Sequence, residues 1–181
     1  MSNTEFVADL KRKFKALGRR IGEGDESELL LWVIPSLLAC CHRPLRHNPL
    51  YGGSARHLDS AATPLVHNWA HRVRADGIRS IICLMSEEEL VFYKRLDLQA
   101  ESLLEFYRAQ GFAVASIPWK DPAHIRSDPE ALRKKERQVS VEALRSFDVL
   151  AKPVLLHCSA GIDRSSPVAA YIRSQRSNAD A

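Results

Sequence analysis

Glycine and proline are scarce in this chain, and their scarcity excludes several classes of protein. Among 181 residues there are 8 Gly and 9 Pro, too few for a collagen-like, low-complexity or linker sequence. Apolar residues make up 45% of the chain and charged residues 27%, which is the composition of an ordinary globular protein. At this length we expect one core-forming domain.

Cysteine and long apolar runs are also few. The four cysteines are Cys40, Cys41, Cys83 and Cys158. The adjacent pair fits neither a disulfide framework nor a Cys-x-x-Cys zinc knuckle, so we expect free thiols. The longest apolar run spans residues 29–41, well short of the ~20 residues that cross a bilayer, and no secretory signal is apparent. Together these features predict a protein of the reducing cytoplasm without a membrane span.

Net charge is likewise small. The chain carries +4, which is too little by itself to indicate a nucleic-acid partner, and we expect none. The excess is local, because residues 1–21 hold six basic and two acidic side chains. The remainder of the chain therefore sums to zero, and the basic character belongs to one segment.

That segment is predicted to be an amphipathic helix. Ser2 and Glu5 have the spacing of a capping box at a helix start. Apolar side chains then recur every three or four positions, which places them on one stripe of a helix. They are Phe6, Leu10, Phe14, Leu17 and Ile21. Two interpretations follow: the stripe packs on the domain and leaves the charges in water, or the helix lies on an anionic lipid surface or an acidic partner.

Downstream, short apolar strands alternate with helical segments. The expected strands are 29–34, 80–84, 112–117 and 153–157, and the expected helices are 65–75, 87–93, 99–110, 129–150 and 167–172. This order predicts an α/β fold, a single domain with a central, mostly parallel sheet of about four or five strands flanked by helices. Residues 43–64 indicate a long irregular loop. Gly-Glu-Gly-Asp at 22–25 marks a joint that separates a basic helix and joint (1–24) from the domain (25–181).

The stretch 154–166 has a pattern that indicates a ligand-binding or reactive site. A buried strand runs into Cys158, and Arg164 follows six residues later, just before a helical pattern. The intervening residues allow the backbone to curl with several N–H groups pointing inward, and Gly161 supplies the freedom that such a curl needs. The positive end of the helix dipole faces the same cavity. This predicts a nest for a tetrahedral oxyanion, with Arg164 holding two of its oxygens.

Cys158 then lies below the expected anion. Converging N–H donors and a helix N-terminus favour a nucleophilic thiolate. The implied reaction is phosphoryl transfer to sulfur, giving a phosphocysteine, followed by attack of water. Ser165 is placed to hydrogen-bond the sulfur, and His157 to orient the loop. The expected phosphate-binding residues are Ser159, Ala160, Gly161, Ile162, Asp163 and Arg164.

His157-Cys158-x5-Arg164-Ser165 resembles the signature of the protein tyrosine phosphatase superfamily, and the strand order resembles its dual-specificity branch. The resemblance covers about residues 29–172. It implies a phosphatase that needs neither metal nor cofactor and acts on phosphotyrosine, and in this branch also on phosphoserine and phosphothreonine, of a phosphorylated protein or peptide. It also implies a carboxylic acid, on a separate loop before the cysteine, that protonates the leaving oxygen.

Asp121 is the acid that fits this resemblance. It lies 37 residues before Cys158 and follows the strand at 112–117. The alternative is a turn-forming Asp before proline. Asp128 is the rival by spacing, but its place before Pro129 is better explained as a helix cap.

Asp163 departs from the commonest pattern of the resemblance, because it places a carboxylate directly before Arg164. Phosphoinositide-directed and some bacterial lipid-directed members carry such an acid, often with a base elsewhere in the loop, where this chain has Ile162. An ion pair with an exposed base is the other explanation. Candidate bases include Arg19, Arg43 and Arg56. The alternatives to a protein phosphatase are thus a phosphoinositide or RNA 5′-phosphate hydrolase, or a non-catalytic phosphate-binding module.

The remaining motifs have plainer explanations. His67 and His71 lie four apart on an expected helix, but no third ligand accompanies them, so we expect no metal site. An oxidative disulfide between Cys158 and another cysteine is a further alternative. Only 23 residues follow Cys158, where related domains add helices, and we expect the apolar stripe of 1–21 to cover that surface.

Overall fold

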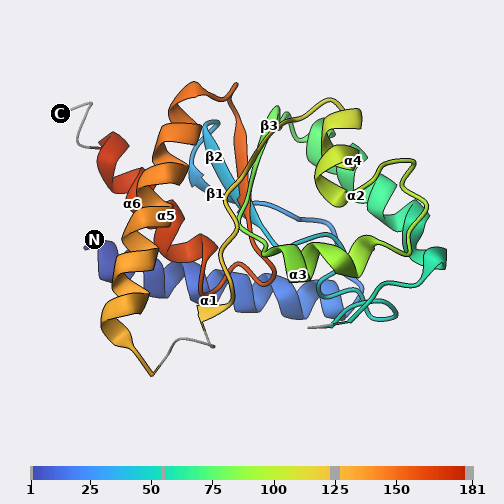
Figure 1. The fold of residues 1–181 in the computed structure, drawn as a ribbon, viewed down its shortest axis with the longest axis horizontal. Helices are drawn as coiled ribbons and strands as arrows, with labels where there is room; N and C mark the ends of the chain where they lie inside the picture. Colours follow the sequence, from blue (N-terminus) through green and yellow to red (C-terminus); the bar gives the residue numbers. More distant parts are fainter. Residues whose placement is uncertain (1, 54–55, 123–126, 178–181) are drawn as a thin grey trace.

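The computed structural model describes residues 2–53, 56–122 and 127–177 and has the predicted α/β fold (Figure 1). The strands are β1 (Leu31–Ile34), β2 (Leu38–Cys41), β3 (Ser80–Cys83), β4 (Ala113–Ser116) and β5 (Val154–His157). They form one sheet in the order β1-β2-β5-β3-β4, in which only the β1–β2 pair is antiparallel. The prediction of a single domain around a mostly parallel sheet is confirmed.

Helices flank the sheet. They are α1 (Asn3–Gly22), α2 (Thr63–Ala75), α3 (Glu87–Leu90), α4 (Leu103–Ala109), α5 (Pro129–Val149) and α6 (Ser165–Ser177), with 3₁₀ turns η1 (Ser60–Ala62) and η2 (Val91–Tyr93). Helices α1, α3, α4 and α5 each begin at a side chain that caps them. Ser2 and Glu5 form the predicted capping box of α1. Asp128 accepts from two amides of α5, which confirms it as a cap. Helix α4 begins after the Ser102 cap, later than the predicted residue 99.

The structure predicted from sequence for the apolar run 29–41 is wrong. The sequence predicts one strand that ends at Pro35, whereas the chain turns there and returns as β2. Ser36 adopts a φ of 59°, and the Leu37 N–H donates to the Ile34 carbonyl. The hairpin was hidden because an almost uninterrupted apolar sequence carries no periodicity that separates two strands. As a result, the strand that pairs with β5 was missed.

Both faces of the sheet are buried. Alternate strand residues such as Ile81 and Leu155 face a cluster that includes α2 and α4, whereas Ile82 and Leu156 face a cluster that includes α5 and α6. In Figure 1 these two helix layers stand on opposite sides of the strands. Burial on both faces explains why the strands are continuously apolar rather than alternating.

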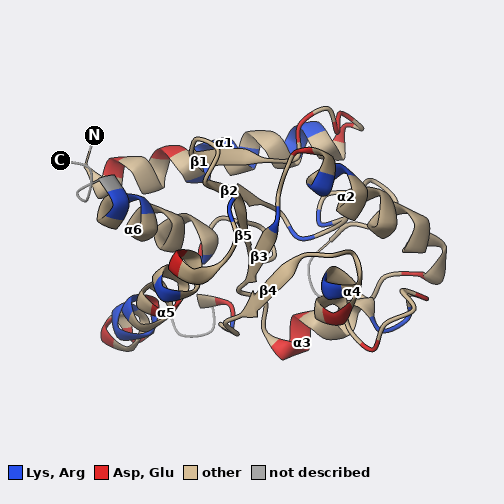
Figure 2. Cartoon of the chain, turned by 90° about the horizontal axis from the view of Figure 1, so that it is seen from above, with Lys and Arg blue, Asp and Glu red and all other residues tan. Residues whose placement is uncertain are grey.

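Helix α1 spans the two layers. In Figure 2 it runs from the neighbourhood of α6 to that of α2. Its apolar stripe is buried, with Phe14 in the α5/α6 cluster and Leu17 in the α2/α4 cluster. The stripe therefore packs on the domain, as the first interpretation predicts, and it covers α6. In the described part of the chain, no helix has the length and apolarity needed to cross a bilayer.

Candidate functional site

Cys158 lies at the carboxyl end of the sheet, directly after β5. The parallel register places Cys41 of β2 and Cys83 of β3 beside His157, the last residue of β5. Cys158 is 2% exposed. Residues 158–164, called the 158–164 loop from here on, lead directly into α6. Segments that follow β2 and β3 therefore border this loop, however distant they are in sequence.

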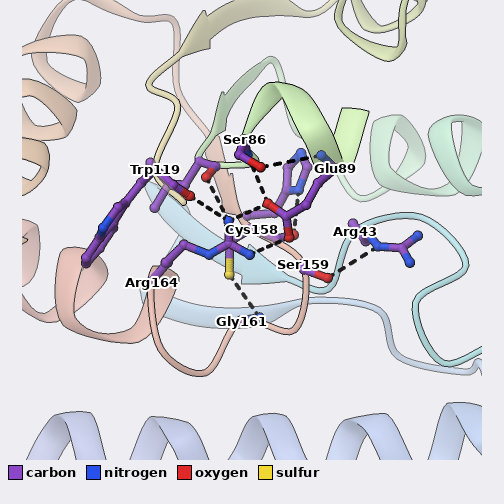
Figure 3. Close-up of polar contacts among 10 residues, drawn as sticks. Arg43, Ser86, Glu89, Trp119, Cys158, Ser159, Gly161 and Arg164 are labelled. Atoms are coloured by element: carbon purple, nitrogen blue, oxygen red, sulfur yellow. Dashed lines mark hydrogen bonds and ion pairs between the residues drawn. The ribbon is translucent and has the colours of Figure 1, made fainter. Parts of the chain in front are cut away.

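The 158–164 loop curls around Gly161. The Gly161 N–H donates to Cys158 Sγ across 3.2 Å, so a main-chain amide faces the sulfur (Figure 3). Gly161 has a φ of 72°, and a Cβ at this position would lie 2.2 Å from the Phe14 ring. Ser166 of α6 donates from both N–H and Oγ to the Gly161 carbonyl. The predicted need for glycine is confirmed, and the neighbouring α1 helix adds a second reason for it.

The Arg164 guanidinium is held by acceptors that the sequence analysis did not identify. Nη1 and Nη2 donate to the two carboxylate oxygens of Glu89 across 2.5 and 2.6 Å, and Nη1 also donates to the Trp119 carbonyl across 2.7 Å (Figure 3). Burial alone would raise the pKa of Glu89, but the hydrogen bonds and charge of Arg164 bring it below its ordinary value. Glu89 therefore stays ionised and fixes the guanidinium in place.

The remaining donors of Arg164 form a second fork. A guanidinium has five N–H donors. The Nη1 hydrogens donate to the Glu89 carboxylate and to the carbonyls of Trp119 and Leu84. One Nη2 hydrogen donates to the other carboxylate oxygen of Glu89. No acceptor among the described residues takes the Nε–H or the second Nη2–H, which are parallel to each other. This pair has the geometry that binds two oxygens of one oxyanion.

Glu89 does carry a signal in the sequence. Ser86 and Glu89 form a capping box at the start of α3, with the Ser86 N–H donating to Glu89 Oε2 across 2.9 Å. This box comes directly after β3, at the edge of the sheet where Cys158 lies. The Ser-x-x-Glu pattern was therefore visible, but its position beside the 158–164 loop depends on the strand order.

The segment after β2 holds the opposite side of the loop. The Arg43 N–H and Nε donate to the Ser159 carbonyl and Oγ across 3.0 and 3.3 Å. His42 Nδ1 lies 3.1 Å from the Ala160 carbonyl. Burial lowers the pKa of His42 to about 3, so the ring is neutral and Nδ1–H is the donor. These two supports were missed together with β2.

Arg43 is itself almost completely buried without a carboxylate partner among the described residues. Its side chain donates to the Tyr93 hydroxyl and to the Gly53 carbonyl, across 3.0 and 2.7 Å. The guanidinium also lies over the rings of Phe92 and Tyr93, with its carbon 5.5 and 5.7 Å from their centroids. Its donors are thus occupied by neutral groups, which makes it a structural support for the loop.

His157 and Ser165 are placed at the two ends of the loop. His157 Nδ1 lies 3.1 Å from the Cys158 carbonyl, in keeping with the predicted role of orienting the loop. Burial lowers the pKa of His157 to about 4, so this ring is also a neutral donor. Ser165 Oγ is buried and has no hydrogen-bond partner among the described residues. The predicted bond from Ser165 to the sulfur is thus not formed in this structure.

Asp121 and Asp163 both line the cavity that contains Cys158 and Arg164, which has a volume of about 530 Å³. Burial alone would lower the pKa of Arg164, but the hydrogen bonds and charge of Glu89 outweigh burial and raise that pKa, and the charge of Asp121 acts in the same direction. Asp163 forms an ion pair of 3.2 Å with Lys11 of α1. A base therefore pairs with Asp163, but it comes from α1 and is none of the arginines considered from sequence.

The remaining residues of the predicted site and the other three cysteines are also located in the structure. Ser159, Ala160 and Ile162 line the cavity. Cys40, Cys41 and Cys83 are free thiols buried in the strands, and burial raises the pKa of Cys83 to about 12. Within the described ranges, no group of three or more His, Cys, Asp and Glu side chains is arranged to hold a metal ion. Comparison with protein-family models and with curated proteins finds no match to this chain.

Proposed function

We propose that this chain hydrolyses phosphomonoesters through a phosphocysteine intermediate, and that its substrate is a phosphorylated protein or peptide, with phosphotyrosine as the main target. One relationship carries the proposal: the Cys158 sulfur faces the Gly161 amide in the same cavity as the guanidinium of Arg164. Because Glu89 occupies one fork of that guanidinium, the other fork is oriented before any substrate arrives.

The proposed reaction has two displacements at phosphorus. The phosphate dianion binds to the loop amides and to the second fork of Arg164, and the Cys158 thiolate attacks phosphorus while the bond to the leaving oxygen breaks. Asp121 gives that oxygen its proton. In the second step, Asp121 accepts a proton from water, whose oxygen attacks phosphorus, and the S–P bond breaks to release phosphate. Ser165 Oγ, which has spare hydrogen-bonding capacity, stabilises the departing thiolate.

The test begins with hydrolysis of p-nitrophenyl phosphate. Cys158→Ser is expected to abolish turnover, because a neutral hydroxyl is a far weaker nucleophile at this position. Rapid acid quench of the wild-type chain with labelled substrate is expected to trap phosphate on Cys158. Cys83→Ala removes a different buried thiol and serves as the matched control, with melting temperatures recorded for all variants. Equal turnover by Cys158→Ser contradicts the proposal.

Substrate profiling then separates the candidate functions. Phosphotyrosine and phosphothreonine peptides, soluble phosphoinositides and RNA with a 5′-phosphate are compared by kcat/KM. The proposal expects the highest value for a phosphotyrosine peptide. The highest value for a phosphoinositide or an RNA would move the chain to the corresponding alternative class. Phosphate binding without turnover of any of these substrates would instead indicate a non-catalytic binding module.

A further inference from the structure

A second guanidinium, that of Arg46, lines the Cys158 cavity. Arg46 lies in the segment after β2 and is partly buried. Its Nε is fully enclosed and has no hydrogen-bond partner, and no carboxylate in the described part of the chain pairs with the side chain. This contrasts with Arg164, whose charge is met by Glu89. Arg46 is thus a cation in the cavity without a counter-ion from the described protein.

The surroundings of Arg46 do not supply the missing negative charge. Burial and the nearby charge of Arg43 lower the pKa of Arg46, while Cys158 and Glu89 act in the opposite direction. Glu89 is already bound to Arg164. His47, another neighbour, is kept neutral because burial lowers its pKa to about 4. A partly desolvated guanidinium without a partner is unfavourable, and an anion that enters the cavity relieves that cost.

The other residues of the cavity wall limit which class of substrate can carry that anionic group. Besides Arg46, the wall includes the carboxylates of Glu88, Asp121 and Asp163. A substrate with several phosphates spread around a ring would bring some of them against these carboxylates. A substrate with one further anionic group beside the phosphate that reacts can place that group against Arg46, and it brings no additional phosphates into the cavity. Phe92, which also lines the cavity, adds an apolar surface for the intervening atoms.

The basic N-terminal helix does not change this preference. Four of its six bases are already in ion pairs with acidic side chains. The pairs are Lys11–Asp163, Arg12–Asp9, Lys13–Asp9, and Arg20 with Asp25 and Glu28. The helix therefore offers little unpaired charge for a phosphoinositide-rich surface, and the observations favour a peptide over a lipid.

We propose that Arg46 binds a second anionic group of a phosphopeptide substrate, a carboxylate or a phosphate on the residue next to the phosphorylated one. This inference rests on the proposed function, because it assumes that the phosphate which reacts lies over Cys158. It makes Arg46 a specificity-determining residue: the chain selects phosphorylated sites with an acidic or phosphorylated neighbour.

The experiment compares three phosphotyrosine peptides that differ only at the neighbouring residues, which are glutamine, glutamate or phosphoserine. Binding is measured by titration calorimetry on the Cys158→Ser chain, and kcat/KM on the chain with its cysteine. We expect glutamate or phosphoserine to improve both quantities about tenfold over glutamine, the gain typical of a hydrogen bond to a charged group. Arg46→Met is expected to bring these ratios close to one, and Arg46→Lys to retain part of them.

Arg79→Met is the matched control, because Arg79 is exposed at the opposite end of β3 and is expected to keep the wild-type ratios. Ratios near one in the wild-type chain, or ratios that Arg46→Met leaves unchanged, overturn the inference. An equal loss for all three peptides also overturns it and assigns Arg46 to the reacting phosphate. A larger gain for a soluble phosphatidylinositol bisphosphate than for the peptides replaces the peptide by a lipid.

Failure of this inference and failure of the proposed function give different results. If the glutamine peptide is bound and hydrolysed but acidic neighbours make no difference, only the role of Arg46 is wrong. If no peptide is bound by the Cys158→Ser chain or hydrolysed by the wild-type chain, the proposed function fails and this inference fails with it.

Discussion

Glu89 and Arg164, which are 75 residues apart in sequence, are joined by two parallel hydrogen bonds in the wall of the Cys158 cavity. Their side chains are only 16% and 4% exposed. When one member of such an enclosed pair is removed, the other charge remains without a partner. In the proposed reaction Glu89 is therefore a positioning residue: it would act on the bound phosphate through the guanidinium and not by contact with the substrate.

Glu89→Gln tests this positioning role. The variant keeps the shape of the side chain but loses its charge, so Arg164 is expected to shift and kcat/KM for p-nitrophenyl phosphate to fall on the order of 10²-fold. Affinity for vanadate, measured by inhibition, is expected to fall in parallel. Glu87→Gln is the control, because Glu87 is an exposed residue of the same helix that does not line the cavity. Unaltered vanadate affinity in Glu89→Gln would contradict the assignment.

Asp121→Asn tests the proposed acid. The loss is expected to be about 10²–10⁴-fold in kcat for an alkyl phosphate, whose leaving oxygen needs a proton, and much smaller for p-nitrophenyl phosphate. Asp128→Asn is the matched control, since asparagine caps a helix as well as aspartate does. Comparable losses for the two leaving groups, or a larger loss from Asp128→Asn, would rule out Asp121 as the acid.

Gly161→Ala tests the contact between the 158–164 loop and α1. The new Cβ meets both a positive φ and the Phe14 ring, so we expect a loss of about 1–3 kcal/mol in the free energy of unfolding together with loss of turnover. Phe14→Ala in the same chain is expected to relieve the clash but not the backbone strain. A double-mutant cycle measured by urea unfolding checks this, and strictly additive effects would show that the two residues do not interact.

Removal of residues 1–21 tests whether α1 is part of the domain. Burial of a large apolar side chain contributes about 1.5–3 kcal/mol, so loss of the whole stripe approaches the entire stability of a typical domain. We expect the shortened chain to melt far below the full chain or not to fold. Lys15→Gln, which changes only an exposed charge, is the control and should shift the melting temperature little. An unchanged melting temperature after the deletion would show that α1 is dispensable.

Acid destabilisation provides a test that needs no substrate. Burial holds the pKa of His42 and His157 at about 3 and 4, below the ordinary value of 6.5. The unfolded chain therefore binds more protons below pH 6.5, so the stability from these neutral rings is present above that pH and is lost as pH falls toward 4. We expect the free energy of unfolding to fall by about 1.4 kcal/mol per pH unit for each ring.

Urea unfolding between pH 7 and pH 4.5 measures that slope. His47, whose pKa is also lowered by burial to about 4, adds to the slope. His157→Asn removes one of the three rings, so its slope is expected to be smaller by about one proton. Mutation of the exposed His71, which leaves the buried rings in place, is the control. A His157→Asn slope equal to that of the wild-type chain would mean that His157 is not held neutral in the folded state.

Local patterns predicted the parts of this molecule that depend on local physics. The α/β class, the cap at Asp128 and the curl at Gly161 each follow from residues close together in sequence. Glu89 and Arg43 could not be assigned in the same way, because they reach the 158–164 loop from 75 and 116 residues away. Their place is set by β2 and β3 lying on either side of β5. Because the β1–β2 hairpin was not predicted from the sequence, this strand order could not be derived.

The Lys11–Asp163 pair shows the same limit. Charge counts correctly located the basic character in residues 1–21, and an ion pair with an exposed base was one of the two explanations considered for Asp163. Which base it is depends on how α1 crosses the domain, and no periodicity in either segment encodes that path. The partner is 152 residues away in sequence.

The contact of α1 with the 158–164 loop and α6 has a consequence for how the chain matures. During synthesis α1 leaves the ribosome before any strand, whereas the segments that it touches emerge after β5. For most of the translation time the apolar stripe of α1 therefore lacks the residues that bury it, and it stays exposed to solvent or is bound by a chaperone. A stalled chain that ends before the 158–164 loop therefore has the helix but lacks Cys158 and Arg164, which line the cavity.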